Sequence, residues 1–121
     1  MKKVLTSHHI SLRHAWAGLV WAFRTQPNFR VHIVLSATAL FFAWYLGISS
    51  VETLIIVFTI ILGLVVEMLN TALESMTDLI TREWREEAKV AKDVAAGMML
   101  LTAAGALIVA GIIFGPYLGA F

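Results

Sequence analysis

The sequence predicts an all-α integral membrane protein, with one helix on the membrane surface followed by three transmembrane helices. Two observations predict this class. Of the 121 residues, 60% are hydrophobic and 14% are charged, and the mean hydropathy is +0.84, whereas a water-soluble domain of this size carries a larger polar surface. The apolar residues are also gathered into three long runs. The chain has no cysteine, which excludes a disulfide framework and a thiolate metal site.

The first expected element is a surface helix over about residues 7–25. Its apolar residues recur at helical spacing beside basic residues, which is typical of a helix lying on a membrane. The apolar set is Leu12, Trp16, Leu19, Val20 and Phe23, and the basic set is Arg13, His14 and Arg24. Residues 6–9 are too polar for the core of a signal peptide, so the apolar segments are expected to remain in the mature protein. His8 and His9 are expected to stay solvated.

Three transmembrane helices are expected over about residues 31–48, 53–80 and 94–114. The first run is long enough for one crossing, and a break at Gly47 to Ser50 follows it. The second is apolar to Val66 and then leaves the membrane as an amphipathic helix. The third is long enough to cross once more, and Pro116 is expected to stop it.

The basic residues predict the orientation of these helices. All nine lysines and arginines lie in two places, before the first run and between the second and third. The turn at residues 47–52 and the tail at residues 115–121 have none. Positive loops stay on the cytoplasmic side, so the N-terminus is expected inside and the C-terminus outside. The chain shows no internal repeat or linker, so residues 1–121 are expected to form one domain.

The third run is rich in glycine and alanine, and Gly111 and Gly115 form a GxxxG motif. Lipid gives helices no hydrophobic reason to associate, so close packing of small residues has to hold them together. Three helices of this length also enclose little space by themselves. A homo-oligomer is therefore expected.

A row of polar side chains follows the second apolar run, namely Glu67, Asn70, Glu74 and Asp78. At about 100° per residue they fall within an arc of about 80° on one helix face. One interpretation is the solvated face of a helix that leaves the membrane, with Glu74 and Asp78 paired to Arg82. The other is a reaction site, because Glu67 stands among apolar residues, where ionisable groups are usually functional.

Such a site suits phosphate transfer to a membrane alcohol. Glu67 and Glu74 are separated by a rise of about 10 Å, so one carboxylate can act as a base near the alcohol while the other holds magnesium near a water-soluble donor. Lys92, followed by Asp93, is either a topological anchor or a partner for a polyphosphate. The chain has neither a P-loop nor a GxGxxG motif, so a nucleotide is expected to be held by side chains and metal. The histidines have no metal-ligand spacing to an acidic partner.

Two stretches resemble the signature of the prokaryotic diacylglycerol kinase family, which includes the undecaprenol kinases. They are VEMLNTALESMTDLI at residues 66–80 and AKVAKDVAAG at residues 88–97. The resemblance extends over essentially the whole chain, including the N-F-R of Asn28 to Arg30. It implies a homotrimeric kinase of the bacterial inner membrane that transfers the γ-phosphoryl group of ATP, with Mg2+, to a lipid hydroxyl. No nucleic acid partner is expected.

The resemblance also implies roles by position. The catalytic group comprises Glu67 as general base, Asn70 and Asp78. The ATP-binding group, whose first member also binds Mg2+, comprises Glu74, Glu83, Lys92 and Asp93. The lipid substrate is expected at Glu67 and Arg30. The expected reaction converts diacylglycerol to phosphatidic acid, and the alternative acceptor is undecaprenol.

One position departs from the family pattern. Just before the N-F pair, where diacylglycerol-type members have a second metal-binding glutamate, this chain has Gln26. An amide oxygen can ligate Mg2+ but brings no charge, so that role is not carried over. The N-F-R-V-H run ending at His32 leans toward the undecaprenol-type members. Two other classes are weighed: a small multidrug transporter, which needs four crossings, and a non-catalytic membrane scaffold.

Overall fold

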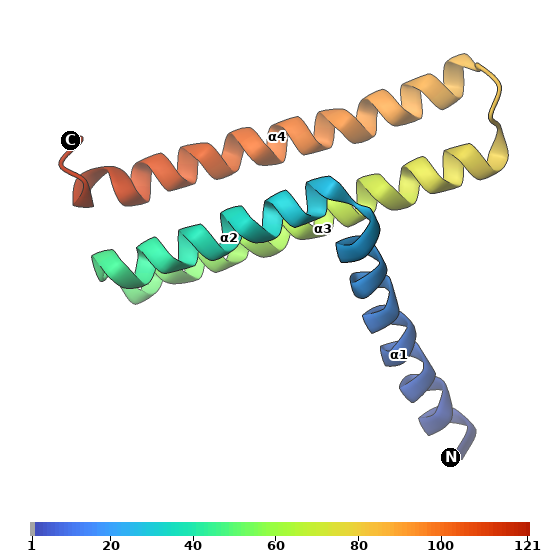
Figure 1. Cartoon of the computed structure of the whole chain (residues 1–121), viewed down its shortest axis with the longest axis horizontal. Helices are drawn as coiled ribbons and strands as arrows, with labels where there is room; N and C mark the ends of the chain where they lie inside the picture. Colours follow the sequence, from blue (N-terminus) through green and yellow to red (C-terminus); the bar gives the residue numbers. More distant parts are fainter. Residues whose placement is uncertain (1) are drawn as a thin grey trace.

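The computed structural model describes the backbone of residues 2–121 and the side chains of residues 11–121. Residues 2–121 form four helices, which are α1 (Lys2–Thr25), α2 (Pro27–Leu46), α3 (Ser50–Ile80) and α4 (Glu86–Tyr117). Figure 1 shows α3 and α4 side by side in antiparallel directions, α2 along α3, and α1 projecting away from the other three. No strand occurs within residues 2–121. The side chains of His8 and His9 lie outside the described residues.

Helices α2, α3 and α4 are each long and apolar enough to cross a membrane. The prediction of an all-α fold with three apolar spans is therefore confirmed. At 1.5 Å per residue α3 and α4 are each more than about 45 Å long, which exceeds the roughly 30 Å hydrocarbon core of a bilayer. Both helices therefore extend beyond the apolar layer and can carry polar side chains outside it.

The helix ends differ from the limits of the apolar runs. Helix α4 begins at Glu86, where Glu86 and Glu87 lie in the first turn and stabilise it through the helix dipole. It also continues through Pro116 to Tyr117, so the expectation that this proline stops the helix is wrong by one residue. In a last turn the missing proline N–H removes one hydrogen bond without interrupting a following ladder. Pro27 occupies the first turn of α2, which suits its fixed φ.

The break between the first two crossings is built by local hydrogen bonds. Gly47 ends α2 in the left-handed conformation, with φ 63° and ψ 41°, which a glycine adopts without steric cost. Ser49 begins α3 with a capping box: the Glu52 N–H donates to Ser49 Oγ at 3.2 Å, and the Ser49 N–H donates to Glu52 Oε2 at 2.8 Å. The turn is therefore specified by three residues.

The same carboxylate joins the two longest helices at this end of the molecule. The Tyr117 hydroxyl, at the end of α4, donates to Glu52 Oε2 at 2.8 Å. Phe121 folds back over Gly115, where a methyl group would clash with the phenyl ring. Glycine at position 115 thus serves a contact within the chain. Gly111, the other glycine of the motif, has open space at the same position and is free to face another helix.

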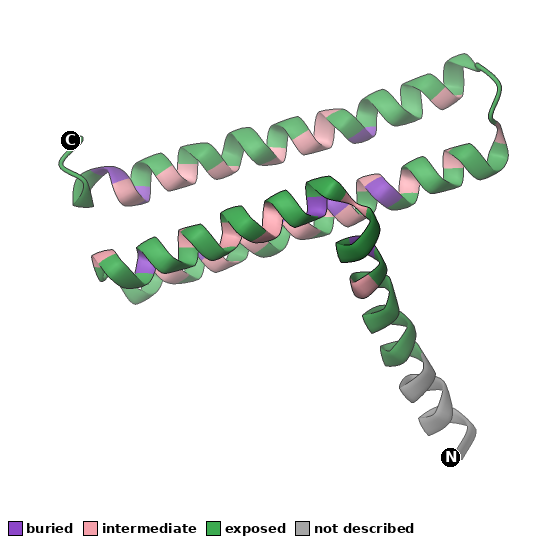
Figure 2. Cartoon of the chain, viewed as in Figure 1, coloured by how far each residue is buried: buried purple, intermediate pink, exposed green. Residues whose placement is uncertain are grey.

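Little of the chain is buried within one protomer. Figure 2 shows the few buried residues on the sides of the helices that face one another. The buried apolar residues are Ala22, Phe29, Ala43, Ile56, Ala95 and Ile113. Large apolar side chains such as Trp44 and Leu107, 77% and 75% exposed, cover the outside of the helices. Such a surface is excessive for a soluble monomer and suits contact with lipid or with further helices.

Candidate functional site

Glu67 is the most deeply buried large side chain of the described residues, with 2% of its surface exposed. It lies on α3 after the apolar run, and the Thr71 hydroxyl, also buried, donates to its backbone carbonyl at 3.0 Å. Glu67 Oε2 has no hydrogen-bond partner among the described residues, and neither does Asn70 Oδ1. Two buried acceptors on one helix face are therefore left without donors from residues 11–121.

Unpartnered buried acceptors are unfavourable. Burying a polar group without a hydrogen bond costs about 1–3 kcal/mol, and more when the group is charged. A purely structural residue at position 67 would be apolar, as its neighbours Val65, Val66 and Met68 are. The arrangement is instead suited to receive a donor from outside the protomer, such as a substrate hydroxyl.

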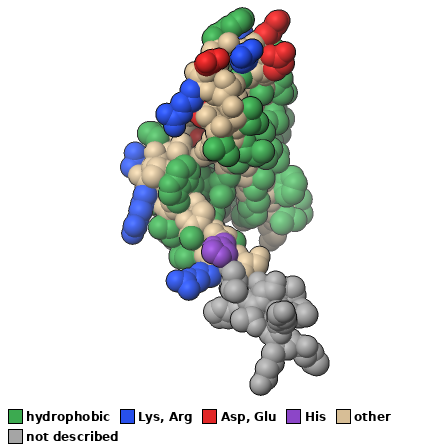
Figure 3. Space-filling model, turned by 90° about the vertical axis from the view of Figure 1, so that its right-hand side faces the viewer, with side chains coloured by type: hydrophobic (Ala, Val, Ile, Leu, Met, Phe, Trp, Pro, Cys, Tyr) green, Lys and Arg blue, Asp and Glu red, His purple; other side chains and the backbone are tan. Residues whose placement is uncertain are grey.

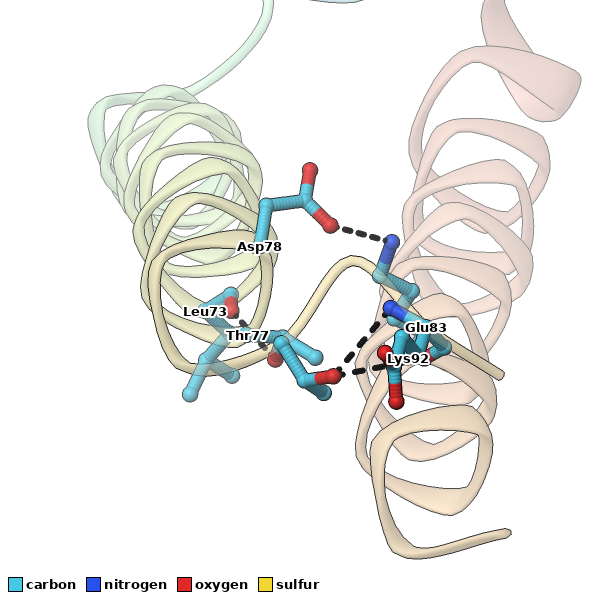
Figure 4. A network of polar contacts seen from close by, with 6 residues as sticks. Leu73, Thr77, Asp78, Glu83 and Lys92 are labelled. Atoms are coloured by element: carbon cyan, nitrogen blue, oxygen red, sulfur yellow. Dashed lines mark hydrogen bonds and ion pairs between the residues drawn. The ribbon is translucent and has the colours of Figure 1, made fainter. Parts of the chain in front are cut away.

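Farther along the same face, α3 becomes exposed and approaches α4. Glu74 and Asp78 are both exposed. Asp78 Oδ1 lies 2.7 Å from Lys92 Nζ on α4, and Figure 4 shows the two side chains pointing toward one another across the space between the helices. Asp93 pairs with Lys89, one turn earlier on its own helix.

The interpretation that paired Asp78 with Arg82 is wrong. Helix α3 ends at Ile80, so Arg82 lies in the turn and is no longer one helical turn above Asp78. Lys92 precedes the apolar run of α4, and the hydrogen bond from its ammonium group to Asp78 raises the pKa of Lys92 above its ordinary value. Lys92 is therefore positively charged at any physiological pH.

A hollow of about 440 Å³ opens at this end, between the two helices and the turn that joins them. Its lining comprises Thr77, Asp78, Thr81, Arg82, Glu83, Trp84, Arg85, Ala88, Lys89, Lys92 and Asp93. Figure 3 shows acidic and basic side chains gathered at this end, above a flank of hydrophobic ones. The turn is held by Thr81, whose Oγ1 accepts the Glu83 N–H at 3.2 Å, and by an ion pair of Glu83 with Arg85 at 3.4 Å. We call this hollow the turn pocket.

The structure brings some of the expected site residues together and separates others. The turn pocket collects Asp78, Glu83, Lys92 and Asp93. Glu67 lies eleven residues before Asp78 on α3, a rise of about 16 Å. Glu74 lies between these two levels. Arg30 is exposed on α2, and half-buried Gln26 precedes that helix and donates through Nε2 to Thr25 Oγ1 at 3.2 Å.

The donor groups allow a limited test of magnesium binding. Within residues 11–121 no three histidine or carboxylate side chains gather into a metal site. Mg2+ commonly takes one or two carboxylates and completes its shell with water and substrate phosphates. A single exposed carboxylate such as Glu74 fits that mode of binding. The described residues do not form a metal site made of protein ligands alone.

One residue of this region has no role at the site in the sequence-based predictions. His32, on α2, packs against α3 so closely that a methyl group at Gly63 would lie 3.5 Å from its Nδ1. Gly63 is one helical turn before Glu67. Only the packing of α2 on α3 shows this relation, because nothing in the spacing along the chain connects residues 32 and 63.

Comparison with known proteins identifies the family. The profile described as prokaryotic diacylglycerol kinase matches residues 13–114. A diacylglycerol kinase of Synechocystis is 42% identical over 108 residues, which are 88% of this chain and 62% of that protein. The undecaprenol kinase of Bacillus subtilis is 38% identical over 109 residues, 89% of this chain and 88% of that protein. A diacylglycerol kinase of Pseudomonas aeruginosa is 32% identical over 94 residues, 78% of this chain and 73% of that protein.

This chain belongs to the prokaryotic diacylglycerol kinase family. It spans a little under two thirds of the length of the Synechocystis relative. A relative named diacylglycerol kinase and one named undecaprenol kinase each match this chain over most of its length.

Proposed function

We propose that this member of the prokaryotic diacylglycerol kinase family is a membrane kinase that transfers the γ-phosphoryl group of ATP to the hydroxyl of a lipid alcohol. The observation that carries the proposal is the unpartnered Glu67 carboxylate, buried on the same helix face that leads to the charged turn pocket. One end of this face suits a membrane alcohol and the other suits a polyphosphate.

Glu67 acts in the proposal as the general base. Its buried, unpartnered carboxylate oxygen accepts the hydrogen bond of the lipid hydroxyl and takes its proton as the oxygen attacks the γ-phosphorus. The bond from that phosphorus to the β,γ-bridging oxygen breaks, and ADP leaves with the electron pair. Asn70, whose Oδ1 is also unpartnered, lies beside the base to orient the hydroxyl. Arg30, on the exposed surface of α2, is assigned to the lipid headgroup region.

The turn pocket binds the nucleotide in the proposal. Lys92 carries a fixed positive charge and neutralises phosphate oxygens, as charged hydrogen-bond donors commonly do. Asp78 holds that ammonium group at 2.7 Å and so sets its position. Glu83 and Asp93 line the same pocket. Glu74 would hold Mg2+, which would supply charge neutralisation at the β and γ phosphates.

Diacylglycerol is the first proposed acceptor and undecaprenol the second. Two of the relatives described above are named for the first lipid and one for the second. Purified protein in lipid vesicles with labelled ATP and Mg2+, and with either alcohol in turn, tests both. Labelled phosphatidic acid supports the first acceptor and labelled undecaprenyl phosphate the second. Absence of both products, with the protein folded, contradicts the lipid kinase proposal.

We also propose a homotrimer in the inner membrane, with the N-terminus and the turn pocket on the cytoplasmic side. The exposed apolar faces and the open position at Gly111 favour packing against further copies. The basic residues of the turn favour its cytoplasmic location, where ATP is found. Crosslinking in membranes that yields trimers, and labelling of the α3–α4 turn only from the cytoplasmic side, are the expected results.

A further inference from the structure

Glu67 is expected to need a partner that fixes its orientation. The structure offers a residue for this purpose that has no role in the function proposed above. Two ionisable side chains lie on this part of the bundle: Glu74, seven residues later on α3, and His32 on α2, which packs beside Gly63. Glu74 is a second carboxylate and cannot donate a hydrogen bond when ionised. His32, which is half-buried on α2, is the nearby group that can.

The geometry brings the two side chains to the same level. Side chains on a helix lean toward its N-terminus, so the Glu67 carboxylate lies over the turn that contains Gly63. Gly63 has no side chain and is buried, and the His32 ring fills the space beside it, with Nδ1 3.5 Å and Cε1 3.9 Å from the position a methyl group would take. An imidazole from α2 thus occupies the space toward which the carboxylate leans.

The surrounding helices leave this pair without competitors among the described side chains. Between Asp93 and Tyr117, α4 has no titratable residue. The described basic and histidine side chains of α1 are exposed, as is Arg30 on α2. The Ser36 hydroxyl, one turn along α2 from His32, donates to the His32 carbonyl at 2.6 Å. The only described hydrogen bond of the Ser36 side chain is therefore to the backbone of its own helix, so Ser36 does not compete for the Glu67 carboxylate.

We propose that His32 is the positioning residue of the general base: Glu67 Oε2 has no hydrogen-bond donor among the described residues of one protomer, and in the working site the imidazole N–H donates to the carboxylate and holds it toward the lipid hydroxyl. The proposal rests on the role of Glu67 proposed above. Replacing the imidazole should therefore change how the rate depends on pH. His32 itself touches neither the phosphate nor the reacting hydroxyl.

Three variants test the proposal by their kinetics between about pH 5.5 and 8.5. His32→Leu removes the hydrogen-bond donor, whereas His32→Gln keeps an N–H donor but no imidazole. We expect His32→Leu to lower kcat by about 10- to 100-fold, as loss of an orienting partner commonly does, with little change in KM for ATP or lipid. His32→Gln should keep more of the rate but lose the part of the pH dependence that the imidazole causes. Ser36→Ala is the matched control on the same face and should match the wild type.

A pH profile of His32→Gln that superimposes on that of the wild type overturns the proposal, and so does a loss confined to the KM for lipid. If His32→Leu fails to fold, the His32→Gln profile alone decides.

Labelling of Glu67 with dicyclohexylcarbodiimide gives a readout that needs no turnover. This apolar reagent modifies carboxyl groups in membranes, and mass spectrometry of the peptide locates the adduct. We expect the pH dependence of Glu67 labelling to change in His32→Gln and to remain unchanged in Ser36→Ala. Unchanged labelling in both variants overturns the proposal. A wild type that labels in this manner but transfers no phosphate contradicts the proposed function while the relation of His32 to Glu67 stands.

Discussion

Replacing Lys92 separates its two interpretations, a membrane anchor and a phosphate-binding group. The variant Lys92→Met keeps the long apolar stem along α4 and removes the charge. The pair with Asp78 is partly exposed, with 44% of the lysine side chain and 56% of the aspartate side chain accessible. Pairs this exposed contribute little to stability, so the midpoint of thermal unfolding should stay close to that of the wild type.

The effect on the nucleotide should be much larger. Loss of a charge-assisted hydrogen bond to phosphate weakens binding by about 10- to 100-fold, so the KM for ATP should rise by that factor. The matched variant Asp78→Asn keeps the shape of the partner and an amide oxygen that accepts the hydrogen bond of Lys92, so the lysine stays in place and the KM for ATP should change by less than about threefold. The assay is initial rate against ATP concentration at saturating lipid, with thermal unfolding of each variant alongside. A normal KM for ATP in Lys92→Met, combined with an altered membrane orientation, refutes the phosphate-binding role.

Three further predictions concern the metal, the far end of the bundle and the assembly. Glu74→Ala should raise the Mg2+ concentration for half-maximal rate by about 10-fold or more, and Glu74→Asp by less; an unchanged Mg2+ dependence contradicts the metal role. Tyr117→Phe, which removes the hydrogen bond to the start of α3, should lower the unfolding midpoint by about 2–5 °C without changing the KM for ATP. The control Tyr45→Phe, at an exposed tyrosine of α2, should leave the unfolding midpoint unchanged. Glu67→Gln and Lys92→Ala proteins, unfolded and reassembled together, should recover roughly a quarter of the sites if each site combines groups from two protomers; a mixture as inactive as each variant reassembled alone places both groups in one protomer.

The helices of this protein are predictable from sequence because each spanning segment shows a long apolar run. Their ends are less so. The first turns of α4, from Glu86 to Asp93, are polar and look like a loop by hydropathy, yet the acidic first turn stabilises them as helix. The capping box at Ser49 is local in sequence, but whether Glu52 also bonds Tyr117 depends on how α4 packs.

The site shows the same division. The row from Glu67 to Asp78 follows from helical periodicity alone, since all its members belong to one helix. The ion-pair partner of Asp78 does not follow from periodicity. Both Arg82 and Lys92 are candidates, and the choice depends on the end of α3 at Ile80. The approach of His32 to α3 likewise depends on the packing of two helices, which local periodicity does not determine.

The turnover number of Glu67→Gln tests the central claim most directly. Glutamine keeps the shape of the side chain and removes its capacity to take a proton. With ATP, Mg2+ and the lipid alcohol that the wild type phosphorylates, we predict that kcat falls by about 100-fold or more while ATP affinity is unchanged, because the proposal puts the nucleotide at the turn pocket, away from Glu67. Turnover of a folded Glu67→Gln protein close to that of the wild type would contradict the account.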